Sequence, residues 1–311
     1  MTARPIVIDC DPGVDDAIAL LLAFASPDEL EVAGVTAVAG NVGLDRTSAN
    51  ALRIRDLTGR GDVPVHAGCA RPILRPLTHA EHVHGETGLD GADLPPPRGA
   101  VADRHAVDFL IDAIAARPGA VTLCAMGPLT NLALAMVKEP GIVDDVREIV
   151  LMGGAIGAGN VTPSAEFNIH VDPHAAAVVF ASGVKLTMIG LDVTHQAIVT
   201  PERLDAVRAI DSSVGRAVAG LLDHYHRIDV DRYGAPGSPL HDPCVIAYLL
   251  RPDLFSGREA FVEIETQSET TLGRTVVDLW GASGREPNAT VIERIDAVGF
   301  FDLLIERLAR F

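Results

Sequence analysis

Short apolar runs alternate with amphipathic stretches through the first two thirds of the chain. The apolar runs predict buried strands at residues 6–8, 32–38, 63–66, 121–124, 149–152 and 186–191. Between them, apolar residues recur with a period of about 3.6, which predicts helices at residues 17–24, 47–57, 106–115, 131–138 and 173–182. Strands that are apolar on both faces and alternate with helices indicate a parallel sheet covered by helices on both sides.

The last third of the chain departs from this alternation. Residues 216–225, 242–250 and 300–310 have helical patterns, whereas residues 261–266 and 275–279 alternate like an antiparallel hairpin. No Ser/Gly tract, charge block or internal repeat separates two halves. We therefore expect an α/β fold in one domain over residues 1–311, with a mostly parallel mixed central sheet flanked by helices.

Composition excludes several classes of partner. A net charge of −17 argues against nucleic-acid binding, which needs a basic face. Cys10, Cys69, Cys124 and Cys244 are widely spaced without a Cys-x-x-Cys pair, so they are interpreted as reduced core thiols. The early apolar run is interrupted by aspartates, and no uncharged stretch is long enough to span a bilayer. We expect a cytoplasmic protein without a membrane or nucleic-acid partner.

Four aspartates lie within the eight residues 9–16, directly after the first predicted strand. Capping of the following helix accounts for one or two of them, but not for four. The carboxyl end of a strand and the amino end of the next helix meet where open α/β sheets bind ligands. Because neighbouring carboxylates repel, a cation that neutralises them is the favoured interpretation, and a hard, oxygen-binding ion such as calcium suits these ligands.

Further polar motifs follow other predicted strands and are expected at the same edge of the sheet. Taken alone, each has a plainer interpretation. Asn41 after Gly40 suits a turn, and Glu166 and Asn168 suit an exposed loop. His241 beside Asp242 suits either a general acid with a pKa near neutrality or a hydrogen bond at the start of a helix, and the residues leave both open.

One motif and six others that follow it in order together resemble the nucleoside hydrolase family, calcium enzymes that cleave the N-glycosidic bond of ribonucleosides. The first is Asp-Cys-Asp-Pro-Gly-Val-Asp-Asp at residues 9–16. It is followed by Ala-Gly-Asn at 39–41, His-Gly-Glu-Thr-Gly-Leu at 84–89, Gly-Pro-Leu-Thr-Asn at 127–131, Leu-Met-Gly-Gly at 151–154, Ala-Glu-Phe-Asn at 165–168 and Leu-His-Asp at 240–242. The resemblance covers nearly the whole chain.

The resemblance also implies roles for particular residues. The calcium ligands would be the carboxylates of Asp11, Asp16 and Asp242 and the backbone carbonyl of Met126, with Asp11 also the general base and His241 the acid for the leaving base. The ribose and base would be bound by Asp15, Asn41, His84, Met152, Asn160, Glu166, Phe167 and Asn168. His82 has no counterpart and is expected to face solvent. Tyr225 and Tyr233, in a polar segment without a clear pattern, are candidates for base contact or a lid.

The implied function is calcium-dependent hydrolysis of ribonucleosides to ribose and free base, in nucleoside salvage or catabolism. A His at position 241 is typical of the inosine–uridine-preferring type, so inosine–uridine or pyrimidine-type substrates are favoured. The family also implies a homotetramer or homodimer. Two rivals remain: a non-catalytic nucleoside- or sugar-binding protein, and a haloacid-dehalogenase-like phosphatase. The phosphatase needs a lysine near the phosphate, and neither Lys138 nor Lys185 is predicted at the carboxyl edge.

Overall fold

The computed structural model describes residues 3–233 and 237–311, excluding the side chains of residues 227–233. Its central sheet has nine strands in the order β10-β9-β11-β6-β5-β4-β1-β2-β3. Their bounds are β1 (Arg4–Cys10), β2 (Leu30–Ala37), β3 (Val65–Ala67), β4 (Thr122–Ala125), β5 (Glu148–Met152), β6 (Leu186–Ile189), β9 (Phe255–Ile264), β10 (Thr275–Asp278) and β11 (Ala289–Ile295). A small second sheet pairs β7 (Ile198–Val199) with β8 (Ser238–Pro239).

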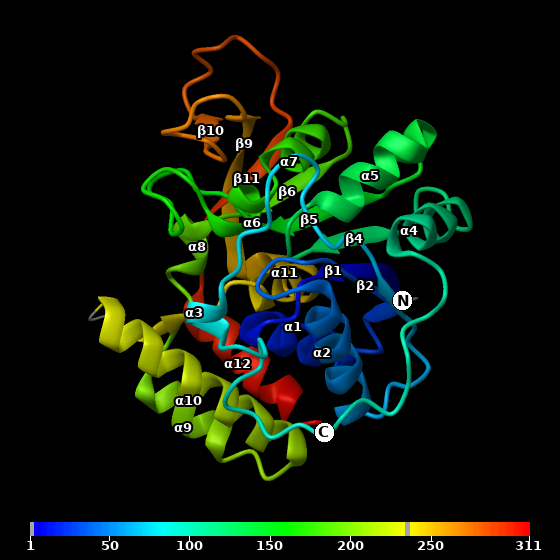
Figure 1. Cartoon of the computed structure of the whole chain (residues 1–311). Helices are drawn as coiled ribbons and strands as arrows, with labels where there is room; N and C mark the ends of the chain where they lie inside the picture. Colours follow the sequence, from blue (N-terminus) through cyan, green and yellow to red (C-terminus); the bar gives the residue numbers. More distant parts are fainter. Residues whose placement is uncertain (1–2, 234–236) are drawn as a thin grey trace.

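Helices cover both faces of the large sheet (Figure 1). They are α1 (Val14–Phe24), α2 (Leu44–Leu57), α3 (Glu81–His84), α4 (Ala106–Ala115), α5 (Thr130–Lys138), α6 (Phe167–Val171), α7 (Pro173–Phe180), α8 (Leu191–Thr194), α9 (Pro201–Arg208), α10 (Ser213–Tyr233), α11 (Pro243–Leu250) and α12 (Ala297–Leu308). Two 3-10 helices, η1 (Pro140–Asp144) and η2 (Pro252–Leu254), complete the described elements.

The alternation of side chains along β1 explains the two hydrophobic cores. Ile6 and Ile8 point into the core formed with α1, α11 and α12, whereas Val7 points into the core formed with α4, α5 and α7. All three side chains are fully buried. A strand apolar on both faces is what a parallel sheet between two helical layers requires, so the predicted α/β fold is confirmed.

The sheet is parallel from β3 across to β11, and only β9 runs antiparallel to its neighbours β10 and β11. The predicted antiparallel hairpin is therefore confirmed, but the sequence prediction missed β11, which separates β9 from β6. The prediction was also wrong to extend the sixth strand to residue 191. The strand ends at Ile189, because the Gly190 carbonyl already accepts the N–H groups of Val193 and Thr194 and starts α8.

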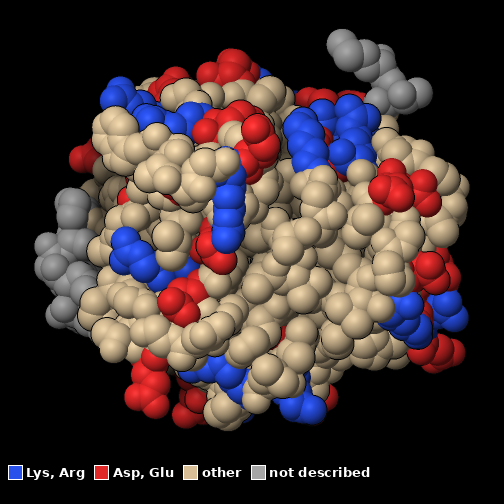
Figure 2. Space-filling model, turned by 90° about the horizontal axis from the view of Figure 1, so that it is seen from above, with Lys and Arg blue, Asp and Glu red and all other residues tan. Residues whose placement is uncertain are grey.

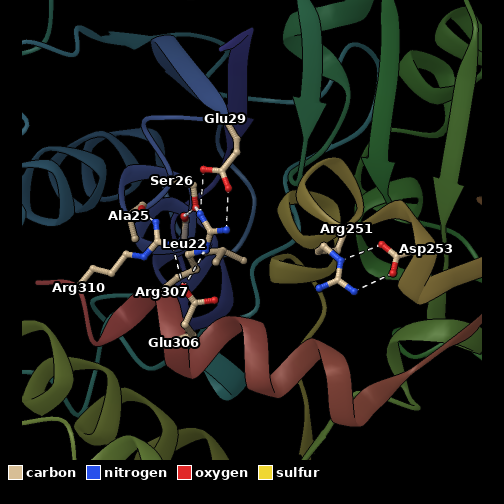
Figure 3. Close-up of polar contacts among 9 residues, drawn as sticks. All are labelled: Leu22, Ala25, Ser26, Glu29, Arg251, Asp253, Glu306, Arg307 and Arg310. Carbon is tan, nitrogen blue, oxygen red and sulfur yellow. Dashed lines mark hydrogen bonds and ion pairs between the residues drawn. The ribbon is translucent and has the colours of Figure 1, made fainter. Parts of the chain in front are cut away.

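The C-terminal helix is fastened to the end of α1 by arginines (Figure 3). Both terminal nitrogens of Arg307 donate to the Glu29 carboxylate, at 2.7 and 2.9 Å, and Arg307 Nη1 also donates to Ser26 Oγ at 3.3 Å. Arg310 Nη1 donates to the Ala25 carbonyl at 3.2 Å. Because the Arg307 side chain is largely buried and its contact with Glu29 is bidentate, this ion pair fixes the orientation of α12 better than a solvent-exposed pair would.

Charged side chains of both signs lie on the one face of the molecule that Figure 2 draws. On the face drawn in Figure 2, acidic and basic side chains surround a mostly uncharged middle, and no broad basic field is visible. Among the described residues, no helix combines the length and apolar character needed to cross a membrane.

Candidate active site

The carboxylate of Asp11, the residue directly after β1, lies between the loops that follow β2 and β4. Asp11 Oδ2 accepts a 2.7 Å hydrogen bond from the backbone N–H of Asn41, which follows β2. A Cβ atom at Gly127 would lie 2.6 Å from Asp11 Oδ1, and one at Gly40 would collide with Asp11 Oδ2. The two glycines therefore let the loops after β2 and β4 close around this side chain. Asn41 is itself buried and its side-chain amide donates to the Asp11 carbonyl, so the turn interpretation of Asn41 is incomplete.

A second group of carboxylates lies beside Asp11. Oxygen atoms of Asp15, Asp16 and Asp242 come within 4.8 Å of one another, and all three residues are buried. Asp16 also accepts from the backbone N–H groups of Asp11, at 3.2 Å, and Gly13, at 3.0 Å. The closest grouping thus includes Asp15, which the resemblance assigns to the ribose, and places Asp11 next to it.

Burial and mutual repulsion raise the proton affinity of this cluster. Burial, followed by the charge of Asp16, raises the pKa of Asp11 well above its usual value. Burial and the charge of Asp15 raise the pKa of Asp16 to about 7 and, again with burial as the larger cause, raise that of Asp242. These carboxyls cannot all be ionised at neutral pH unless a positive charge compensates them.

Asp9 has a separate environment, although it belongs to the same sequence motif. Its Oδ1 accepts from Thr36 Oγ1 at 2.5 Å and from Asn131 Nδ2 at 2.8 Å, which joins β1 to β2 and to the start of α5. Its backbone carbonyl accepts from the N–H of Met126 at 2.8 Å. Asp9 therefore supports the loops that carry the site instead of entering it.

The opposite wall is organised by Glu166, the N-cap of α6. Its carboxylate accepts from the N–H groups of Asn168 and Gly154, both at 2.9 Å, and burial raises its pKa to about 7. Asn168 Nδ2 then donates to the carbonyl of Met126 at 2.8 Å and to that of Met152 at 3.1 Å. Since Glu166 and Asn168 are buried, the exposed-loop interpretation of both is wrong.

Two histidines and a tyrosine occupy the remaining side. His84 Nδ1 accepts a 3.1 Å hydrogen bond from the N–H of Val14, and its ring stacks on Tyr225 at a centroid distance of 5.8 Å. Burial lowers the pKa of His84 and lowers that of His241 to about 4. His241 Nδ1 lies 2.7 Å from Thr194 Oγ1, and the ring of His195 is 5.7 Å from that of His241.

These walls enclose a cavity of about 600 Å³. Every predicted site residue lines it except Asp11 and Asp16, which lie behind its acidic wall: the lining includes Asp15, Asn41, His84, Met126, Met152, Asn160, Glu166, Phe167, Asn168, His241 and Asp242. His82 is exposed, as expected, yet it also lines the cavity. Tyr225 lines it too, whereas the side chain of Tyr233 lies outside the described residues.

Sequence reasoning missed part of this lining, notably Val83, His195, Ile198 and Pro239. His195 carried a usable signal, because it follows a predicted strand, as the other motifs do. Ile198 and Pro239 come from the small β7–β8 sheet, whose two-residue strands are too short to produce a periodic pattern.

The donor set fits a hard divalent cation. Hard carboxylate oxygens are concentrated at one place, and Asp11 Oδ1 is a buried oxygen without a hydrogen-bond partner among the described residues. The Met126 carbonyl lies at the same edge of the sheet, directly after β4. An uncompensated carboxylate oxygen in a buried acidic cluster is the environment that a divalent cation stabilises.

An α/β sheet with an acidic cluster and a histidine facing one cavity at its carboxyl edge defines a candidate metal-assisted hydrolase. The sequence profile described as "Inosine-uridine preferring nucleoside hydrolase" matches residues 6–302, and the chain belongs to this family.

Individual relatives also carry names of nucleoside hydrolases. The chain is 50% identical over 311 residues to the pyrimidine-specific ribonucleoside hydrolase RihA of Shewanella woodyi, and the alignment covers 99% of each chain. The structure of this chain is similar to that of a purine-preferring ribonucleoside hydrolase from Gardnerella vaginalis, with a TM-score of 0.92, 32% identity and 98% of each chain covered. A plant nucleoside hydrolase gives a TM-score of 0.93 at 32% identity, covering 98% of this chain and 99% of the other.

Proposed function

We propose that this protein hydrolyses the N-glycosidic bond of ribonucleosides, releasing ribose and free base, in nucleoside salvage or catabolism. The observation that carries the proposal is one cavity of about 600 Å³ whose lining includes both buried carboxylates of the acidic cluster and His241. A ribonucleoside has the matching polarity, with a vicinal diol at one end and a base that gains negative charge as the C1′–N bond breaks.

The residues divide the work between them. Asp15 and Asn41 bind the ribose hydroxyls, and Asn160, Glu166 and Asn168 bind the side that carries the 5′-hydroxyl, with Met152 and Phe167 packing on the sugar. Asp11 takes the proton of the attacking water, which suits a carboxylate with one buried, unpartnered oxygen. His84 contacts the base, and His241 donates a proton to it as it leaves.

Calcium would be held by Asp11, Asp16, Asp242 and the Met126 carbonyl. When bound, it would supply positive charge to the ribose diol and increase the acidity of a nearby water. The surrounding residues keep this wall ordered: Asn41 donates to both Asp11 and Asp16, and Asn168 fixes the Met126 carbonyl.

An inosine–uridine or pyrimidine-type preference is favoured. The support is His241 in the lining of the cavity and the 50% identity to a relative described as pyrimidine-specific. The structural relative from Gardnerella vaginalis is described as purine-preferring, but it is only 32% identical. A panel of uridine, cytidine, inosine and adenosine at equal concentration, compared by kcat/KM, tests the preference directly.

The phosphatase alternative is not supported by the lysines. Lys138 Nζ pairs with Asp108, and Lys185 Nζ donates to Glu148 at 3.0 Å. Lys185 precedes β6 and Glu148 begins β5, so this pair lies at the amino edge of the sheet, opposite the aspartates. The remaining alternative is a non-catalytic nucleoside- or sugar-binding protein. A reducing-sugar assay on ribonucleosides with calcium present distinguishes it from a hydrolase. Absence of free ribose from every ribonucleoside would reject the enzymatic proposal.

We further propose a cytoplasmic homotetramer or homodimer. Four free, buried cysteines support a reducing compartment. Exposed apolar side chains, including Trp280 at 91% exposure and Leu74 at 68%, support burial of surface between copies. Light scattering coupled to size exclusion at micromolar concentration tests the assembly, and a monomer mass of 32.7 kDa would reject it.

A further inference from the structure

His241 is hydrogen-bonded to a buried residue, Thr194, that does not itself line the cavity. Thr194 Oγ1 lies 2.7 Å from His241 Nδ1. Thr194 is completely buried at the end of α8, which follows β6, and it is absent from the lining of the cavity. The two residues come from segments 47 positions apart, so the contact is a tertiary one.

The backbone around both residues is fixed independently of their side chains. The Thr194 N–H donates to the Gly190 carbonyl at 3.1 Å, and the Thr194 carbonyl accepts from the N–H of Ala197 at 2.9 Å. The Ala197 carbonyl in turn accepts from the N–H of Leu240, the residue before His241, at 2.9 Å. The β7–β8 pairing continues this connection. The hydroxyl is therefore presented to the imidazole by a rigid frame, and Thr is itself stiff about χ1.

Nδ1 of His241 is thereby engaged in the hydrogen bond with Thr194, and Nε2 is the nitrogen that would interact with a ligand. A neutral imidazole carries its proton on either Nδ1 or Nε2, and the hydrogen bond made by one nitrogen selects the state of the other. If the hydroxyl of Thr194 donates to Nδ1, the N–H is on Nε2. In the opposite arrangement Nε2 would present a lone pair to the cavity and repel a base that gains negative charge.

We propose that Thr194 is a positioning residue whose hydroxyl donates a hydrogen bond to Nδ1 of His241 and so keeps the N–H of Nε2 directed at the departing base. The inference rests on the proposed nucleoside hydrolysis and adds the group that orients its leaving-group donor. Thr194 does not line the cavity in which ribose and base would bind, so its effect should depend on how much the leaving group needs a donor.

The test compares Thr194→Val, which keeps the shape and loses the hydroxyl, with Thr194→Ser, which keeps the hydroxyl. Each full-length variant is assayed with calcium on uridine and on p-nitrophenyl riboside, whose leaving group departs without a proton. We expect Thr194→Val to lower kcat for uridine about 10-fold, the worth of one hydrogen bond, with KM changed less than about threefold. Activity on p-nitrophenyl riboside should stay within about threefold of native, and Thr194→Ser should recover most of the loss on uridine.

Equal losses on the two substrates, or a Thr194→Ser variant as impaired as Thr194→Val, would overturn the inference while leaving the hydrolase assignment intact. If the native protein releases ribose from no ribonucleoside, the proposed function itself fails, and the inference fails with it.

A second measurement does not depend on turnover. In protein labelled with ¹⁵N-histidine, the ring nitrogen shifts report which nitrogen carries the proton, and His241→Gln identifies the resonances of this ring. We expect the Nε2–H form in the native protein and a mixture of the two forms in Thr194→Val. A native ring with its proton on Nδ1 would overturn the proposal even if the variants fold poorly.

Discussion

Asp11 and Asn41 end up in contact although they follow different strands: the Asn41 backbone N–H donates to Asp11 Oδ2 at 2.7 Å. The same carboxylate leaves Oδ1 buried and, among the described residues, without a hydrogen-bond partner. One oxygen is thus used to orient the side chain, and the other is available for chemistry. This division is what a general base that also binds a cation needs.

Replacing Asp11 should therefore abolish most of the activity. Asp11→Ala removes the proposed base and one calcium ligand together, so we expect kcat to fall by about 10³-fold or more. Asp11→Asn keeps an oxygen for the Asn41 N–H and should lose nearly as much, since an amide is not a base. Steady-state kinetics on uridine measures both. The exposed Asp28→Ala serves as the control and should behave like native protein. Near-native turnover in Asp11→Asn would show that the base is another group.

Sequence reasoning located the acidic wall because its residues are clustered in the chain. Asp11, Asp15 and Asp16 follow one strand within six residues, so a strand–helix boundary alone brings them together. The contacts that depend on tertiary packing gave no such signal. The stacking of Tyr225 on His84 and the hydrogen bond between Thr194 and His241 each join segments that are distant in the sequence. The local sequence of these segments does not indicate which residue each one contacts.

The prediction of strands was likewise limited to elements with a local sequence signal. The doubly apolar strands β1, β4 and β5 were found from their composition. In contrast, β11 contains Thr290, Glu293 and Arg294, and it is a strand because it pairs with β6 and β9. Its place in the sheet is a result of tertiary pairing, which local propensity does not encode.

Calcium should stabilise the fold measurably. The raised pKa values of Asp16 and Asp242 reflect burial and mutual repulsion, which a bound cation relieves. At about 100 times its Kd, a ligand adds about 2.7 kcal/mol, which corresponds to roughly 5 °C in Tm for a chain of this size. Thermal unfolding in EDTA and in calcium measures the shift.

Asp242→Asn provides the matched comparison for the calcium experiment. It removes one ligand charge with little change of shape, so its Tm in EDTA should equal or exceed that of the native protein while the calcium-dependent rise is largely lost. A native Tm that is the same with and without calcium would contradict the metal site.

His84 should make the metal-free protein sensitive to acid. Its Nδ1 accepts the Val14 N–H, and burial lowers its pKa below the ordinary value of 6.5, so the folded state favours the neutral ring. The unfolded state takes up a proton as the pH falls below 6.5, whereas the folded state resists it. Stability from this residue is therefore fully present above pH 6.5 and is lost as the pH falls toward the lowered pKa.

Urea unfolding in EDTA at pH 7.5 and 5.0 tests this dependence. His84→Asn keeps an acceptor near the Val14 N–H but does not titrate. Between the two pH values the native protein should lose up to about 2 kcal/mol more free energy of unfolding than this variant. Because both proteins share all other titrating groups, including the acidic cluster, the difference isolates His84. Equal losses in the two proteins would mean that His84 is protonated in the folded state at no cost.

His241 should matter in proportion to the basicity of the leaving group. General acid catalysis contributes about 10²–10⁴-fold where a poor leaving group must be neutralised, and little where the leaving anion is already stable. We therefore expect His241→Ala to lower kcat for uridine or inosine by about 10²-fold or more and to leave p-nitrophenyl riboside within about threefold. The neighbouring Asp242 is the main risk, because damage to the acidic wall would slow both substrates. The calcium-dependent rise in Tm should therefore be retained in His241→Ala. If that rise is retained and both substrates are nevertheless slowed equally, His241 positions the ribose and does not assist the departing base.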